Sequence, residues 1–380
     1  MNDLGPLGIL VASLIVWLGL YLVSRFLPFE KYNVEVQPLY LIYRTKRYND
    51  LLNKIAGRHP RLWRVVFNIS VAVAVGLVAF AGYFLTSNLL RFIYAPQEAE
   101  RVFLLIPGVT LRPKWFPYIL VAAGLAVTIH EMAHGVAACL EGIPIKSSGI
   151  VLAVITFGGF VEPEEKPFKE AKVASRLRVV ASGSLTSLVV GLLALLLILG
   201  LYLPPAGVLV ESVREGGPSH LGGVRPWDVI YGVNGTGVGN VGELSDLVSG
   251  VRIGDALIFD TSGGVKRVVV GANPQNESRA SLGLTELADY NPMRLGGLGL
   301  PHSYYVYLTL SWLYLIGVSL AIFNMMPLYP FDGDAFVSSI VEAWVGKEAK
   351  GVRIALNGVF LALMVANLGM SLITFGLIPI

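Results

Sequence analysis

The sequence predicts an α-helical polytopic membrane protein with about six spans, a re-entrant β-hairpin and one extramembrane β-rich domain. The first observation is composition: hydrophobic residues make up 54% of the 380 residues and charged residues only 14%, whereas a soluble domain carries about 25% charge. The second is that long apolar stretches alternate with basic connections. The third is one long polar segment, residues 204–302, which has strand-like runs separated by glycine turns.

Each predicted span is long enough to cross a bilayer, which takes about 20 apolar residues in a helix. The first stretch begins without a basic residue and shows no small-residue cleavage site, so we interpret it as a retained span and not as a signal peptide. A shorter apolar run at residues 148–160 contains three glycines and favours a re-entrant hairpin. The six predicted spans are residues 4–23, 65–85, 117–140, 179–203, 304–326 and 354–377.

The basic connections predict the orientation in the membrane. Residues 25–64 hold nine Lys and Arg against three acids, and the connection after the third span holds six Lys and Arg. Because cytoplasmic loops are enriched in these residues, both connections are expected on the cytoplasmic side of the cell membrane. Both termini and the polar segment are then expected on the outer side. The net charge of +3 reflects this topology, so no nucleic-acid partner is expected. Cys139 is the one cysteine, so no intramolecular disulfide can form.

The third predicted span contains the pattern H-E-x-x-H. On a helix, His130 and His134 share a face and can hold one zinc ion, while Glu131 beside them can take a proton from water. The same five-residue pattern also arises by chance in soluble helices, where the charges are merely solvated. Here the three groups lie within an apolar span, where each charge costs about 2.5–3.5 kcal/mol, which favours a functional role.

A catalytic zinc site takes three protein ligands and keeps one position open. The predicted topology disfavours the remaining histidines, which are His59, His220 and His302. A carboxylate is therefore the expected third ligand.

Asp332 is the candidate, because it follows the fifth span on the side where the third span ends. Pro327 and Pro330 break the helix before it, and Gly333 permits a tight turn after it. Asp334 competes for the same role but lies closer to the loop. The alternative is a proline-rich helix end with solvated acids.

The two motifs together resemble the site-2 protease family of intramembrane metalloproteases. The matching positions are His130, Glu131, His134, Asn324, Pro327, Pro330, Asp332 and Gly333. The resemblance implies that His130, His134 and Asp332 ligate one zinc ion per chain and that Glu131 is the catalytic acid and base. Residues 158–163 resemble the family's hairpin near the active site, which adds Gly158 and Gly159 as supporting positions.

The chain departs from the family at Ser187. The family often has an asparagine here, four residues after a glycine that corresponds to Gly183. A serine is shorter and has fewer donors, which puts an oxyanion or substrate role for this position in doubt.

The polar segment resembles a PDZ domain, in residues 207–210, 222–230 and 233–235. In PDZ-like folds the first of these stretches is the peptide-facing strand. A peptide groove is therefore expected along Gly207, Val208, Leu209 and Val210. The alternative is a generic small β-domain.

These features divide the chain into four regions. Residues 1–116 form an N-terminal membrane region with two spans, residues 117–203 the catalytic spans and hairpin, residues 204–303 the extracytoplasmic PDZ-like domain, and residues 304–380 the C-terminal spans with the aspartate motif.

The resemblance implies an intramembrane zinc metalloprotease that cuts a transmembrane segment of another protein within the lipid bilayer. The expected substrate is a single-span regulator whose outer domain has already been trimmed. Two alternatives remain, a zinc-binding membrane transporter and an inactive protease-like membrane receptor. The sequence contains only one cluster of possible metal ligands, which argues against a transporter. It also keeps Glu131, which argues against an inactive relative.

Overall fold

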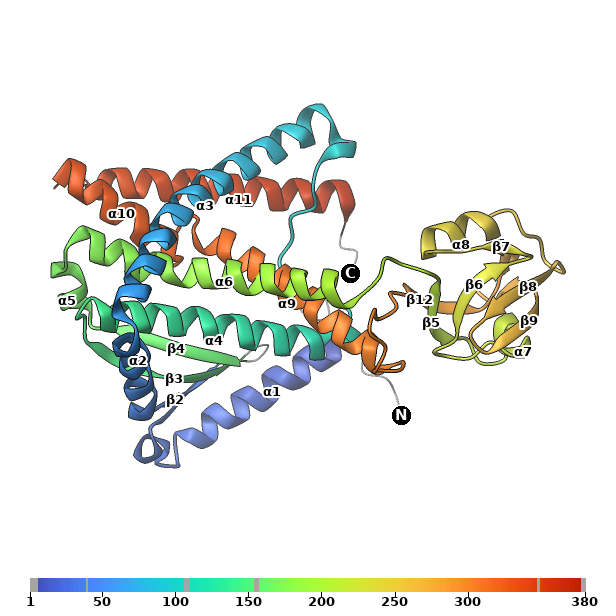
Figure 1. The fold of residues 1–380 in the computed structure, drawn as a ribbon, viewed down its shortest axis with the longest axis horizontal. Helices are drawn as coiled ribbons and strands as arrows, with labels where there is room; N and C mark the ends of the chain where they lie inside the picture. Colours follow the sequence, from blue (N-terminus) through green and yellow to red (C-terminus); the bar gives the residue numbers. More distant parts are fainter. Residues whose placement is uncertain (1–5, 39, 106–109, 154–156, 347–348, 377–380) are drawn as a thin grey trace. The chain divides into compact units, whose positions relative to one another are not determined.

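The computed structural model describes residues 6–38, 40–105, 110–153, 157–346 and 349–376. The chain folds into two compact units, which are described here separately (Figure 1). The first consists of Met1–Ala194 with Ser311–Ile380, and the second of Leu195–Leu310.

Long apolar helices build most of the first unit. Among the described residues, five helical segments are long and apolar enough to cross a membrane: Pro60–Tyr94, Pro113–Leu140, Val173–Leu201, His302–Asn324 and Ala349–Phe375. They comprise helices α3 (Pro60–Tyr94), α4 (Phe116–Leu140), α6 (Val173–Leu201), α9 (His302–Asn324) and α11 (Ala349–Phe375). These segments coincide with five of the six predicted spans, so the chain is a multi-pass membrane protein.

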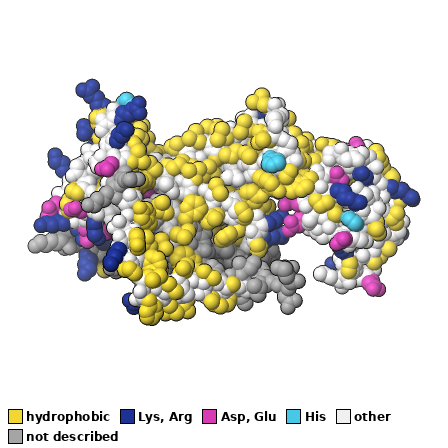
Figure 2. Space-filling model, turned by 90° about the horizontal axis from the view of Figure 1, so that it is seen from below, with side chains coloured by type: hydrophobic (Ala, Val, Ile, Leu, Met, Phe, Trp, Pro, Cys, Tyr) yellow, Lys and Arg dark blue, Asp and Glu magenta, His cyan; other side chains and the backbone are white. Residues whose placement is uncertain are grey.

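The first predicted span corresponds to α1 (Pro6–Ser24). Its described apolar part, Leu14–Ser24, is shorter than the other five segments, so a sixth crossing stays a prediction. Figure 2 shows hydrophobic side chains over much of the helical surface, with Lys and Arg gathered toward the end that carries α2 (Lys46–Arg58) and α5 (Glu165–Glu170).

Small residues bring α6 and α9 into backbone contact. A Cβ atom added to Gly191 would lie 2.9 Å from the backbone nitrogen of Val318, and one added to Gly317 would lie 2.8 Å from the backbone nitrogen of Gly191. Such close approach is how helices associate in lipid, where the hydrophobic effect does not drive them together. The crossing fixes α9, whose C-terminal end leads into the aspartate motif.

The predicted hairpin forms two antiparallel strands, β3 (Ile145–Ala153) and β4 (Phe157–Pro163), and its tip at residues 154–156 lies outside the described residues. The sequence did not predict that two short strands of the basic connection, β1 (Val34–Gln37) and β2 (Tyr40–Arg44), extend this hairpin into a sheet of order β1-β2-β3-β4. The sheet joins the two basic connections, which agrees with their expected position on one side of the membrane.

The second unit holds a small β-rich fold in the polar segment. Its main sheet has the order β12-β5-β6-β8-β9, and β7 pairs with β6. Buried apolar residues such as Val210, Ile230 and Phe259 form the core. The elements are β5 (Val208–Val213), α7 (Pro218–Leu221), β6 (Val229–Val233), β7 (Thr236–Gly237), α8 (Val241–Val248), β8 (Ala256–Thr261), β9 (Gly264–Val269), β10 (Gly271–Asn273), β11 (Asn276–Ser281) and β12 (Leu284–Asp289).

The structure corrects the expected peptide groove. Strand β5 pairs with β12 on one side and with β6 on the other, and Val208, Leu209 and Val210 are all 0% exposed. Gly207 also faces β6, because a Cβ added there would lie 3.0 Å from the carbonyl oxygen of Ile230. A peptide adds to a free strand edge, so these four residues cannot receive one.

Strand β9 is one edge of this sheet, and the other edge strand is β12. A hollow of about 530 Å³ lies beside it, between α8 and the β11–β12 segment. Its apolar lining includes Val241, Leu244, Val248, Leu282, Leu284 and Leu287.

Candidate metal centre

Helix α4 places the two histidines one turn apart on its buried face. His130 is 3% exposed and His134 is 8% exposed. Their Nε2 atoms lie 3.1 Å from each other. The apolar run before them keeps the helix continuous through this turn.

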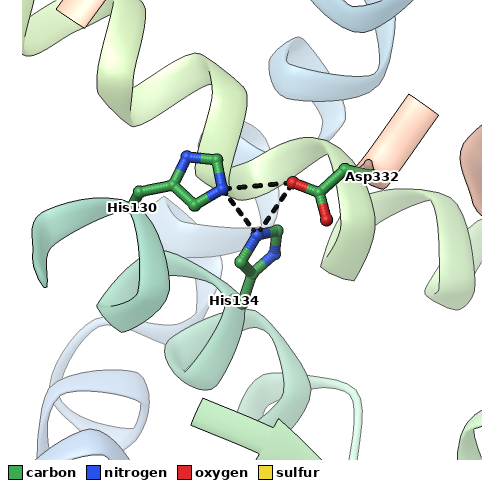
Figure 3. Close-up of side chains that lie close together, drawn as sticks. All are labelled: His130, His134 and Asp332. Atoms are coloured by element: carbon green, nitrogen blue, oxygen red, sulfur yellow. Dashed lines mark hydrogen bonds and ion pairs between the residues drawn. The ribbon is translucent and has the colours of Figure 1, made fainter. Parts of the chain in front are cut away.

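Asp332 reaches the same point from α10 (Asp332–Val345). Helix α9 ends at Asn324, the chain then turns through the two prolines, and Asp332 begins the next helix. Its Oδ2 atom lies 3.1 Å from His130 Nε2 and 3.2 Å from His134 Nε2, as Figure 3 shows. The structure thus brings together the three side chains that the sequence paired across 200 residues.

The donor set fits a zinc ion. Ligands at about 2.0–2.1 Å from a tetrahedral zinc lie about 3.3 Å from each other, close to the observed spacing of 3.1–3.2 Å between the three donor atoms. Among the described residues, these three form the one group of at least three His, Cys, Asp or Glu side chains that converge in this way. His59, His220 and His302 lie elsewhere.

Helix α6 orients both imidazole rings. The Nδ1 atom of His134 donates to the carbonyl oxygen of Val179 at 2.7 Å, and the Nδ1 atom of His130 lies 2.9 Å from the Ser187 hydroxyl. Occupying Nδ1 in this way leaves Nε2 free for a metal and fixes the ring orientation. Ser187 is 0% exposed, and its hydroxyl lies against His130.

Gly183 lets α6 approach the two rings. A Cβ atom added there would lie 2.6 Å from His130 Nε2 and closer still to His134 Nε2. Any side chain would therefore occupy the space in which the three donor atoms meet. The sequence showed this glycine as a motif position but gave no reason for it.

The remaining motif residues shape the turn that carries Asp332. The Asn324 amide nitrogen lies 3.0 Å from His130 Nε2, at the edge of the centre. A Cβ on Gly333 would overlap the backbone of Met325 and Met326, so the turn closes only with glycine. Pro327 and Pro330 lie within the turn itself.

Asp334 does not join the centre. It is 3% exposed and forms an ion pair with Arg353 of α11, while the Asn357 amide nitrogen donates to its Oδ1 at 2.8 Å. Burial alone would raise the pKa of Asp334, but the hydrogen bonds from Arg353 and Asn357 outweigh it and hold this pKa below its ordinary value. The Asn357 side-chain oxygen also accepts from the Tyr329 backbone N–H. These contacts, which the sequence did not reveal, tie the aspartate turn to the last helix.

Glu131 projects from α4 toward β4. Its Oε2 atom accepts a hydrogen bond from the Val161 backbone N–H at 3.2 Å, and one turn earlier the Thr128 hydroxyl accepts from the Gly159 N–H at 2.9 Å. Gly158 makes this approach possible, because a Cβ there would lie 2.9 Å from Val127 Cγ1. The carboxylate thus lies between the three donor residues and the hairpin.

Comparison with known proteins agrees with this arrangement. The model of peptidase family M50 matches residues 118–367, which is more than half of the chain. An uncharacterised protein of Methanocaldococcus jannaschii is 25% identical over 332 residues, or 86% of this chain and 83% of that protein. A "Membrane-bound transcription factor site-2 protease homolog" of Arabidopsis thaliana is 25% identical over 231 residues, or 58% of this chain and 44% of that protein.

A shorter similarity involves another class of protease. A "Probable periplasmic serine endoprotease DegP-like" of Pseudomonas putida is 33% identical over 96 residues, which is 24% of this chain and 20% of that protein.

Proposed function

The chain belongs to peptidase family M50, and we propose that it is an intramembrane zinc endopeptidase that cuts transmembrane segments of other proteins. The observation that carries the proposal is the convergence of His130, His134 and Asp332 beside Glu131, on helices apolar enough to span a membrane. The same three residues are proposed to hold one zinc ion per chain. Because buried ionisable groups in a membrane protein are costly, such a cluster indicates chemistry and not packing.

The reaction that this site supports is hydrolysis of a peptide bond. A zinc ion bound there would polarise the scissile carbonyl and make water more acidic. Glu131 takes the proton from the attacking water and delivers it to the nitrogen of the leaving amine, so that the C–N bond breaks as the new C–O bond persists. The Asn324 amide, 3.0 Å from His130 Nε2, is placed to donate to the carbonyl oxygen as it gains negative charge.

The substrate has to be extended at the cut, because a helical backbone has already used its hydrogen bonds. We propose that β4 holds this extended segment. The N–H groups of Gly159 and Val161 point away from β3 and toward α4, where Thr128 and Glu131 accept from them. Carbonyl groups of a substrate strand can replace these two acceptors, which would also release Glu131 for catalysis.

The second unit is proposed to be a PDZ-like domain, encoded by residues 204–303, on the outer side of the cell membrane. The hollow between α8 and the edge strand β12 is its candidate peptide groove. Such a domain can admit substrates whose outer part has been trimmed and exclude those with a bulky one. A tag near Gly250 should be labelled only from outside and one within residues 25–64 only from the cytoplasm; the opposite labelling would invert the topology.

Cleavage in cells tests the function. We expect co-expression with single-span membrane regulators to release a fragment from at least one of them, and Glu131→Gln to abolish the release while zinc stays bound. A transporter would move zinc across the membrane and release no fragment. A receptor without activity would bind the regulator equally well with Glu131 or Gln at this position and leave it whole.

A further inference from the structure

Helix α2 of the basic connection packs on the helix that carries the metal ligands. It has one apolar face, and Leu52 on that face is 0% exposed. A Cβ on Gly135 of α4 would lie 2.6 Å from Leu52 Cδ1, so the two helices approach closely there. Tyr48 lies four residues before Leu52 and shares its face. Helix α2 of the basic connection therefore places Tyr48 against the turns of α4 near Glu131.

The Tyr48 hydroxyl is buried at the junction of α2, α4 and β4. It has no hydrogen-bond partner among the described residues. A Cβ on Gly159 of β4 would lie 3.3 Å from this hydroxyl and 3.3 Å from Thr128 Cγ2. A buried polar group without a partner costs free energy, so a hydrogen-bond acceptor brought to the Tyr48 hydroxyl by a bound segment would remove that cost.

The hydroxyl is a donor under ordinary conditions. Burial raises the pKa of Tyr48 to about 12, and the nearby negative charge of Glu131 adds to the effect. The phenol therefore keeps its proton and can donate a hydrogen bond to an acceptor. The two β4 N–H groups on this side are taken by Thr128 and Glu131, and neither of these side chains accepts from Tyr48.

We propose that Tyr48 is a substrate-binding residue of the active site, whose hydroxyl donates to a main-chain carbonyl of the segment held along β4 beside Glu131. The inference rests on the proposed function, because it concerns how that protease holds its substrate. An unwound transmembrane segment brings carbonyl groups that have lost their helical partners into a region with little water, where each needs a donor. Gly159 leaves room for this contact, since any side chain there would press on the hydroxyl.

Tyr48→Phe tests the proposal, because it removes the hydroxyl and keeps the ring that packs against the core. With a purified protein and a single-span substrate, we expect kcat/KM to fall about tenfold, the effect of one lost hydrogen bond to a bound carbonyl. Zinc content should stay the same and Tm should stay the same or rise, because the hydroxyl has no partner in the resting protein. Tyr43→Phe, on an exposed side chain of β2 (43% exposed), is the matched control and should change nothing.

Three outcomes would overturn the inference. Wild-type kcat/KM in Tyr48→Phe would show that no substrate group uses the hydroxyl. A fall in Tm that accompanies the loss of activity would show that a trapped water or side chain already uses it in the resting protein. Gly159→Ala, which places a methyl group against the hydroxyl, should also lower kcat/KM; an unaffected rate would show that no substrate passes this point. If the wild type itself releases no fragment, the proposed function fails and takes this inference with it.

Discussion

Gly183→Ala should remove the metal from the centre. The added methyl carbon would lie 2.6 Å from His130 Nε2 and closer to His134 Nε2, whereas an ordinary van der Waals contact begins at 3.4 Å. One or both rings would have to retreat by about 0.8 Å. They cannot do so freely, because their Nδ1 atoms bond to Val179 and Ser187 of the same helix, α6.

The size of the effect follows from how narrowly a metal site tolerates displacement. Metal–ligand distances usually stay within about 0.2 Å of their ideal values, so a ring shift of about 0.8 Å takes at least one ligand out of reach. Loss of a mere supporting contact costs about 10–100-fold in metal affinity. We therefore expect Gly183→Ala to weaken zinc binding by at least about 100-fold and to abolish cleavage.

The assay is a competition titration with a chromophoric zinc chelator, together with the zinc content of the purified protein. Gly200→Ala is the control: it makes the same substitution in the same helix, where a Cβ would meet nothing within 4 Å. Because alanine favours a helix over glycine by about 1 kcal/mol, this control should keep its zinc and be slightly more stable. Wild-type zinc affinity in Gly183→Ala would refute the geometry of the centre.

Three further predictions concern Ser187, Arg353 and the second unit. Ser187→Ala removes the hydroxyl that lies 2.9 Å from His130 Nδ1 and should weaken zinc binding by about tenfold, with little change in the Tm of the zinc-free protein. A Tm that falls by the same amount in the zinc-free and the zinc-bound protein would show that Ser187 is a packing residue only. Arg353→Leu leaves the buried Asp334 carboxylate without its ion pair and should cost about 1–2 kcal/mol of stability, because the Arg353 side chain is 47% exposed and Asn357 still donates to the carboxylate. Because the folded pKa of Asp334 lies below its ordinary 3.8, this contribution is present above that pH and disappears as the pH falls below it; a difference in Tm that persisted in strong acid would contradict the assignment. Residues 207–289 can be replaced by a short Gly/Ser linker, because the Ala206 N–H donates to the Tyr290 carbonyl at 2.9 Å and the two ends are therefore close. The variant should keep its zinc and cut untrimmed substrates as well as trimmed ones. Loss of zinc from the folded variant would mean that the second unit is part of the catalytic core.

The helices and the pair of histidines could be predicted because each depends on a pattern of residues close together in the sequence. Twenty apolar residues specify a span, and a four-residue spacing puts His130 and His134 on one face whatever surrounds them. Chain position made Asp332 the candidate and Asp334 its competitor, and the family motif was needed to choose between them. The structure separates the two through Arg353, which lies in another helix.

The contacts that orient the site were out of reach because they depend on how helices face each other. Ser187 and Gly183 read as ordinary small residues of an apolar helix until α6 is seen against α4. Strands β1 and β2 have four and five residues, and β2 pairs with the hairpin strand β3, which lies about a hundred residues later in the chain. Short strands of this kind carry little periodicity of their own.

The misplaced peptide groove has a different cause. Strand order in a sheet is not contained in the sequence of one strand. The continuous apolar run of Val208, Leu209 and Val210 is typical of a strand that is buried on both faces, and this signal argued against an open edge. Strand β12, whose sequence is LTELAD, has polar residues at three of its six positions and no such apolar run.

Zinc-dependent cleavage by the purified protein tests the central claim most directly. The protein is stripped of metal with a chelator, mixed with a single-span substrate in lipid, and titrated with zinc while fragment release and bound zinc are measured together. We predict no cleavage without metal, full cleavage at about one zinc per chain, and no cleavage by Glu131→Gln even though it binds the same amount. Cleavage by the metal-free protein, or by Glu131→Gln at the wild-type rate, would contradict the assignment of this site as the catalytic centre.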